Sequence, residues 1–154
     1  MKYKIYTDGA CSNNGKENPV GGSAYVVLDE KENIILEKAF KIEPATNNIC
    51  ELKALIEGCS AISSILRFND SVIVYSDSAY CINAYKQNWV DGWIRRGWIT
   101  SARTPVKNRE LWEQLYEFFI HPCFTFEKVK GHTGEKDWND YVDKKAVEAK
   151  NFTN

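Results

Sequence analysis

The 154-residue sequence contains no apolar run that approaches the roughly 20 residues of a membrane-spanning helix. Its first residues, MKYKIYTD, lack the apolar core of a signal peptide and alternate as a strand does. Internal repeats, linkers and low-complexity segments are absent as well. These absences argue against a membrane or secreted protein. They favour one cytoplasmic domain over residues 1–154, a length at which a single core buries most of the apolar surface.

The sequence also lacks any close pair among its five cysteines. Zinc knuckles need cysteines at short spacings, and disulfide frameworks need an even, clustered set, so neither is expected. We expect free thiols in a reducing compartment at all five positions: Cys11, Cys50, Cys59, Cys81 and Cys123.

Net charge is nearly absent, but the charge is segregated along the chain. The formal net charge is −1, yet between Lys86 and Arg109 six basic residues accompany a single acid, Asp91. This window therefore carries +5 and the rest of the chain −6. It also holds three of the five tryptophans: Trp89, Trp93 and Trp98. Basic residues interleaved with aromatic rings suit a nucleic-acid groove, although a solvated helix pair with core tryptophans has the same composition.

The pattern of apolar residues predicts an α/β fold. Alternating or β-branched segments predict strands over 2–8, 23–30, 33–42, 71–77 and 124–130. A three- to four-residue period predicts a long helix over 46–66, capped by Thr46 or Asn47, and further helices follow over 78–87, 106–119 and 137–150. Short connections favour an antiparallel meander of the first three strands, and a helical crossover makes the fourth a parallel neighbour. We expect a mixed five-stranded sheet, three strands antiparallel and two parallel, flanked by helices.

Two of these strands are expected to end on an aspartate, Asp8 in YTDGACSNNG and Asp77 in VYSD. Parallel neighbours would bring both to carboxyl ends of the sheet, where ligand sites form. Glu51 heads an apolar stripe in the first helix, and Asp143 in the last helix has apolar neighbours one turn on. Turn formation by the aspartates and a favourable helix-dipole contact by Glu51 are the alternatives.

Four carboxylates in one pocket would raise one another's pKa unless cations neutralise them. Hard oxygen ligands without a histidine or cysteine cluster suit Mg²⁺, with Mn²⁺ as a substitute. Two such ions about 3.5–4 Å apart are the usual apparatus for phosphodiester hydrolysis. The acids therefore predict a metal-dependent nuclease.

Five segments occur in the order found in one family: YTDGACSNNG, TNNICELKAL, VYSDSAY, WIRRGW with PVKNRELW, and VKGHTG followed by NDYVDKKA. Over nearly its whole length the chain resembles type 1 ribonuclease H. The resemblance implies hydrolysis of the RNA strand of RNA–DNA hybrids, leaving 5′-phosphate and 3′-hydroxyl ends. It makes Asp8, Glu51, Asp77 and Asp143 the catalytic, metal-binding acids. The resemblance also implies that His132 assists proton transfer or product departure.

The same resemblance implies the substrate contacts. The RNA side would be lined by Cys11, Asn14, Asn47 and Asn48. Amide groups suit this role because they pair with 2′-hydroxyls without adding charge, although capping and turn formation are alternatives. A phosphate pocket for the DNA strand would comprise Thr46, Lys107 and Asn108. The DNA channel would be flanked by Trp89, Trp93, Arg95 and Arg96. His121, beside Pro122, is expected to be structural.

Two other functions remain open at this point. One is a hybrid-binding module without catalysis, which the complete set of acids disfavours. The other is a related polynucleotidyl transferase or junction nuclease, because a fold alone does not determine a function. We expect a monomer that binds a hybrid substrate and no membrane.

Overall fold

The structure is a computed structural model and describes residues 1–12, 17–129 and 137–152. Its five strands form one sheet in the order β3-β2-β1-β4-β5. Their bounds are Lys2–Ser12, Val20–Leu28, Ile34–Ile42, Ser71–Ser76 and Phe124–Lys128 for β1 to β5. β1, β2 and β3 are antiparallel, whereas β4 and β5 are parallel to β1, so the predicted mixed sheet is confirmed.

The prediction that the first strand ends at Asp8 is wrong, because β1 continues to Ser12. The small polar residues after Asp8 are still paired with β2, down to Ser12 opposite Val20. A long run of backbone hydrogen bonds to β2 thus overrides the preference of these residues for turns. Pairing between β1 and β4 stops earlier, at Tyr6 opposite Tyr75.

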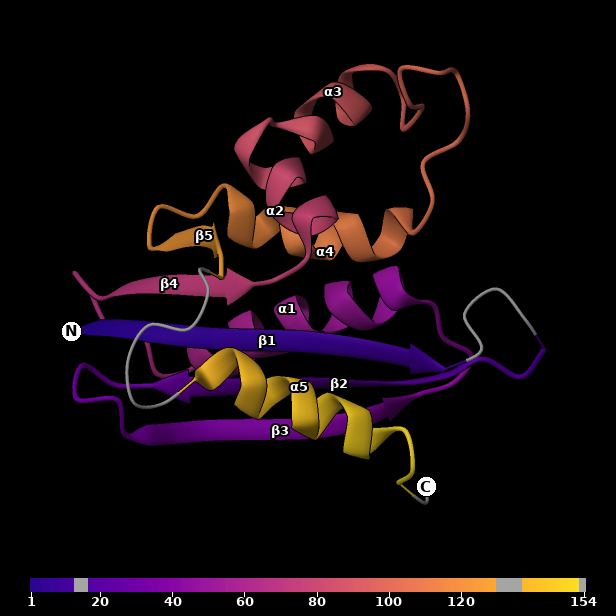
Figure 1. Cartoon of the computed structure of the whole chain (residues 1–154). Coiled ribbons are helices and arrows are strands. Elements are labelled where there is room, and N and C mark those ends of the chain that lie inside the picture. Colours follow the sequence, from indigo (N-terminus) through magenta and orange to yellow (C-terminus); the bar gives the residue numbers. More distant parts are fainter. Residues whose placement is uncertain (13–16, 130–136, 153–154) are drawn as a thin grey trace.

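Helices cover both faces of the sheet (Figure 1). In the part of the chain that the structure describes, one side of the sheet carries four helices: α1 (Asn47–Ser63), α2 (Ala79–Lys86), α3 (Trp89–Arg95) and α4 (Arg109–Phe119). The fifth helix, α5 (Trp138–Ala149), lies on the other side. The main core packs under α1, α2 and α4, and is formed by residues such as Ile5, Leu52 and Trp112. A smaller core joins Val26 and Leu28 to Trp138 of α5. Within the described residues, none of the helices is long and apolar enough to cross a membrane.

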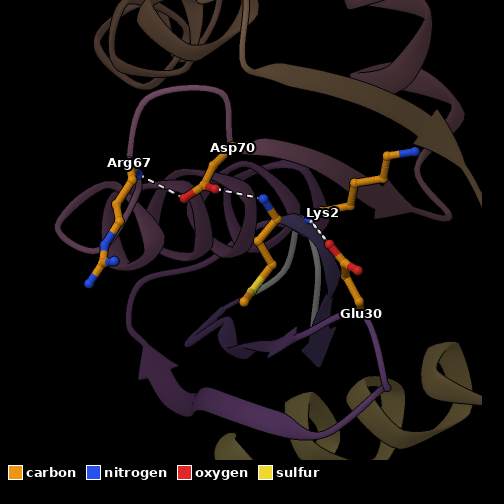
Figure 2. A network of polar contacts seen from close by, with 5 residues as sticks. Lys2, Glu30, Arg67 and Asp70 are labelled. Carbon is orange, nitrogen blue, oxygen red and sulfur yellow. Dashed lines mark hydrogen bonds and ion pairs between the residues drawn. The ribbon is translucent and has the colours of Figure 1, made fainter.

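The ends of β1 and β4 that lie farthest from the aspartates are held by polar contacts (Figure 2). The amine of Met1 donates to Asp70 Oδ1 over 2.8 Å, and the backbone N–H of Arg67 donates to Asp70 Oδ2 over 2.8 Å. The backbone N–H of Lys2 donates to Glu30 Oε1, also over 2.8 Å. The Arg67 side chain points away from this network (Figure 2). These contacts fix where β1 and β4 begin, and hence their register.

Candidate active site

Asp8 and Asp77 lie at a step in the sheet where β4 ends and β1 continues. The last pair between these strands is Tyr6 and Tyr75, and each aspartate lies two residues further along the chain. Asp8 is 3 % exposed, whereas Asp77 is exposed. The shared register therefore brings the two carboxylates to the same edge, as open α/β sheets do with ligand-binding groups.

Glu51 reaches this edge because α1 is pressed closely onto the sheet. The helix begins at Asn47 and is capped by Thr46, whose Oγ1 accepts from the Ile49 N–H over 3.1 Å. The buried hydroxyl of Ser23 in β2 donates to the carbonyl oxygen of Cys50 over 2.7 Å. A β-carbon on Gly9 would lie 2.4 Å from the carbonyl carbon of Cys50 and 2.5 Å from the nitrogen of Glu51. The first turns of α1 thus lie directly on β1.

The three carboxylates form a cluster. One oxygen from each of Asp8, Glu51 and Asp77 lies within 4.8 Å of the other two. Burial, followed by the negative charges of Glu51 and Asp77, raises the pKa of Asp8 well above its ordinary 3.8. Burial and the charge of Asp77 likewise raise the pKa of Glu51. Such a cluster is electrostatically costly unless a cation is present.

A divalent cation fits these residues. Glu51 Oε2 is buried and has no hydrogen-bond partner among the described residues, so it is free to bind a ligand. Together with the acceptor-only oxygens of Asp8 and Asp77, it offers the hard donor set that Mg²⁺ and Mn²⁺ prefer.

Asp143 approaches the cluster from α5 on the opposite face of the sheet. Its side chain is exposed and lies near enough to the Asp8 carboxyl to help raise the pKa of that group. The three-residue cluster does not include it. α5 is anchored nearby, because Lys150 Nζ donates to Ser12 Oγ over 2.8 Å. On the surface of α5, Lys144 Nζ and Asp140 Oδ2 form an ion pair at 3.1 Å.

The residues expected on the RNA side lie around the start of α1. Asn47 and Asn48 are exposed in its first turn, and Cys11 is half-buried near the end of β1. Asn14 and His132 fall outside the described residues. His121 accepts the Cys123 N–H at Nδ1 over 3.1 Å and packs edge-on against Phe124, as its expected structural role requires.

The segment between α2 and α4 divides into a buried and an exposed side. Trp93 is 8 % exposed and packs edge-on against Trp112 with ring centroids 5.2 Å apart, so this ring belongs to the core. Trp89 is half-buried, and Arg95 and Arg96 are exposed. The sequence patterns did not identify α3, which carries three of these four side chains.

Lys107 and Asn108, assigned to the phosphate pocket, directly precede α4. Lys107 is exposed, and Asn108 adopts a left-handed conformation with φ 60°. An 830 Å³ pocket includes Asn108 in its lining, together with three cationic and two acidic side chains: Lys41, Lys53, Arg109, Glu43 and Glu110. The cationic side chains suit a phosphate backbone.

Two residues shape the site without taking part in its chemistry, and of these only Ser23 was not indicated by the sequence. Ser23 holds Cys50, and Gly9 admits α1, yet neither contributes a reactive group. The sequence does carry a signal for Gly9, because glycine inside a strand often marks the close approach of another backbone. For a serine among the apolar residues of β2, no such local signal exists.

A mixed α/β sheet with clustered carboxylates at its crevice defines the class of metal-dependent enzymes that cleave or transfer phosphodiesters. The family model described as RNase H matches residues 1–151. The chain belongs to the RNase H family, so the predicted family and the nuclease class are confirmed.

Comparisons with individual proteins support this family assignment. The chain is 44% identical to a ribonuclease H of Clostridium botulinum over 148 residues, covering 96% of this chain and 95% of the relative. It is 39% identical to a ribonuclease H of Thermoanaerobacter over 145 residues, with coverages of 94% and 87%. A solved type 1 RNase H with the type 2 active-site motif is 26% identical, with a TM-score of 0.76 and coverages of 96% and 71%. A foamy viral protease-reverse transcriptase in complex with dsDNA shares the fold, at TM-score 0.82, 16% identity and coverages of 97% and 94%.

Proposed function

We propose that this chain hydrolyses the RNA strand of RNA–DNA hybrids at the cluster of Asp8, Glu51 and Asp77, with Asp143 as the fourth acid. The observation that carries the proposal is the meeting of three carboxyl groups within 4.8 Å in a member of the RNase H family. A fold relative supports the substrate class, since one solved foamy viral protease-reverse transcriptase is in complex with an RNA/DNA hybrid.

The cofactor is Mg²⁺, as two ions, and Mn²⁺ substitutes for it. Asp8, Glu51, Asp77 and Asp143 would hold the ions, because they supply only hard oxygen donors. The chemistry that bound ions supply is activation of the attacking water and stabilisation of the departing 3′ oxygen, which leaves 5′-phosphate and 3′-hydroxyl ends. His132 assists proton transfer or product departure, since an imidazole titrates near neutral pH.

Substrate discrimination falls to the residues around α1 and α3. Cys11, Asn14, Asn47 and Asn48 contact the RNA strand, where amides pair with 2′-hydroxyls. Thr46, Lys107 and Asn108 bind a phosphate of the DNA strand. Arg95 and Arg96 contribute charge to the DNA channel, and the half-buried Trp89 lines it with the buried Trp93 packed behind. We further propose one catalytic domain over residues 1–154 that acts as a cytoplasmic monomer, since all five cysteines are free.

A cleavage assay tests the activity and its substrate together. Labelled hybrid, duplex DNA and duplex RNA are compared with Mg²⁺, with Mn²⁺ and with a chelator, and Asp77→Asn serves as the inactive variant. We expect cleavage of the hybrid alone, only with a divalent ion, and loss of cleavage in the variant. Binding of hybrid without cleavage would instead identify a non-catalytic module. Cleavage of duplex DNA would identify a junction nuclease or transferase.

A further inference from the structure

Cys11 and Cys50 lie in one small apolar cluster beside the carboxylates. Cys50 is fully buried with Ile42 and Ala45, and Cys11 packs against the same group. Cys11 is half-buried and therefore reachable from solvent. The remaining cysteines lie elsewhere, with Cys59 and Cys81 in the main core and Cys123 just before β5.

The register of β1 and β2 places the two sulfurs close together. Cys11 is directly opposite Gly21. A β-carbon built on Gly21 would lie 2.3 Å from Cys50 Sγ, so this sulfur occupies the place where the side chain opposite Cys11 would stand. Directly opposite residues have Cβ atoms about 4.5–5.5 Å apart, so the sulfur of Cys50 lies within reach of the Cys11 side chain after a small movement of either residue.

We propose that Cys11 and Cys50 form a reversible disulfide under oxidation by a peroxide, and that this bond switches the nuclease off. The accessible Cys11 thiol is first oxidised by hydrogen peroxide to a sulfenic acid, and one water is released. The Cys50 sulfur then attacks the Cys11 sulfur, the S–O bond breaks, and the departing hydroxide takes the Cys50 proton as a second water. Two thiols are oxidised and one peroxide is reduced to two waters.

The bond would act on the site through the backbone of α1. Cys50 immediately precedes Glu51, and its carbonyl is held by Ser23 while its backbone lies on Gly9. Drawing the Cys50 sulfur toward the end of β1 would shift this turn and move the Glu51 carboxylate relative to Asp8. A displacement of about 1 Å at a catalytic group costs up to about 10²-fold in rate.

The first measurement detects the disulfide itself and does not depend on nuclease activity. The full chain is treated with hydrogen peroxide, its remaining thiols are alkylated, and it is digested and analysed by mass spectrometry without reduction. We expect the peptides containing Cys11 and Cys50 to be joined, and to separate on treatment with dithiothreitol. Oxidation of Cys11 alone, to a sulfinic acid or a mixed disulfide, with Cys50 still open to alkylation after unfolding, would overturn the proposal.

The second measurement is the ratio of hybrid cleavage rates before and after peroxide. We expect a fall of roughly tenfold or more in the wild type, recovered with dithiothreitol. Cys50→Ala should remove this fall, because Cys11 then has no partner thiol. Cys123→Ser is the matched control, since Cys123 is also half-buried, and it should respond as the wild type does. Equal sensitivity of Cys50→Ala and the wild type would refute the switch.

Discussion

Gly9 of β1 lies against the backbone nitrogen of Glu51, so closely that a β-carbon at Gly9 would stand 2.5 Å from it. This contact sets the distance between the helix that carries Glu51 and the strand that carries Asp8. Real β-carbons essentially never come closer than 3.0 Å to another heavy atom, and here the neighbours are backbone atoms. A side chain at position 9 would therefore force α1 and β1 apart.

Gly9→Ala should therefore separate Glu51 from Asp8. We expect hybrid cleavage to fall by about 10²-fold, because the carboxylates no longer share one cluster. Stability should fall by about 1–3 kcal/mol, as overpacking usually costs. Single-turnover cleavage and urea unfolding measure the two effects. Wild-type activity in this variant would show that the spacing between α1 and β1 is not critical.

Ser23→Ala removes the buried hydrogen bond that holds the carbonyl of Cys50. Because this buried carbonyl loses the hydroxyl that supplements its helical hydrogen bond, we expect a loss of about 1 kcal/mol in the free energy of unfolding. Ser63→Ala is the control, since the exposed Ser63 donates a similar bond to the Cys59 carbonyl over 2.8 Å. It should change stability by less than about 0.5 kcal/mol. Equal effects of the two substitutions would contradict the assigned role of Ser23.

Asp8→Asn should stabilise the metal-free protein at neutral pH while it abolishes cleavage. The folded state raises the pKa of Asp8 above its ordinary 3.8, so the folded protein binds the proton more tightly than the unfolded chain does. Stability contributed by the protonated group is present at low pH and is lost as the pH rises toward the folded pKa. In the presence of a chelator, we expect the free energy of unfolding of the variant to be higher by about 1–3 kcal/mol, which corresponds to a melting temperature several degrees higher.

Two conditions should reduce this difference in stability. Below pH ~4 the wild-type carboxyl is protonated in both states, and the gain of the variant should shrink. Added Mg²⁺ should stabilise the wild type more than Asp8→Asn, since a ligand of the folded state raises its stability. Calorimetry under the three conditions measures both. A variant that is less stable than the wild type in chelator at neutral pH would argue against repulsion in the cluster.

Arg95→Ala should weaken hybrid binding and reduce its dependence on salt. Arg95 is exposed on α3, so it contributes charge without holding the fold. Loss of one phosphate contact should lower the slope of log binding constant against log salt by about 1. Arg96 is a less clean probe, because its Nε also donates to the Ile99 carbonyl over 3.0 Å.

Arg67→Ala is the matched control for the salt experiment. Arg67 is also exposed, but it lies at the other end of the sheet, where its side chain points away from the Asp70 network (Figure 2). Its removal changes the net charge by the same amount. An unchanged slope is expected, measured by fluorescence anisotropy with a labelled hybrid. Equal slopes for both variants would remove Arg95 from the interface.

The local sequence predicted most of the elements and the acids of the candidate site. The apolar period placed α1, and Thr46 proved to be its cap. The placement of the carboxylates among small or apolar neighbours, and the five ordered motifs, pointed to Asp8, Glu51 and Asp77. These features are readable because backbone geometry and local hydrogen bonding repeat over a few residues.

Sequence alone determined most of the elements, their order and the acidic residues of the candidate site. Tertiary structure decided that β1 runs past Asp8, that Trp93 is buried, and that Glu51 stands beside Asp8. The physical reason is that these outcomes depend on strand register and on contacts such as Gly9 with α1, between residues far apart along the chain. A local pattern reports which face of an element is apolar, but only packing sets which groups meet there.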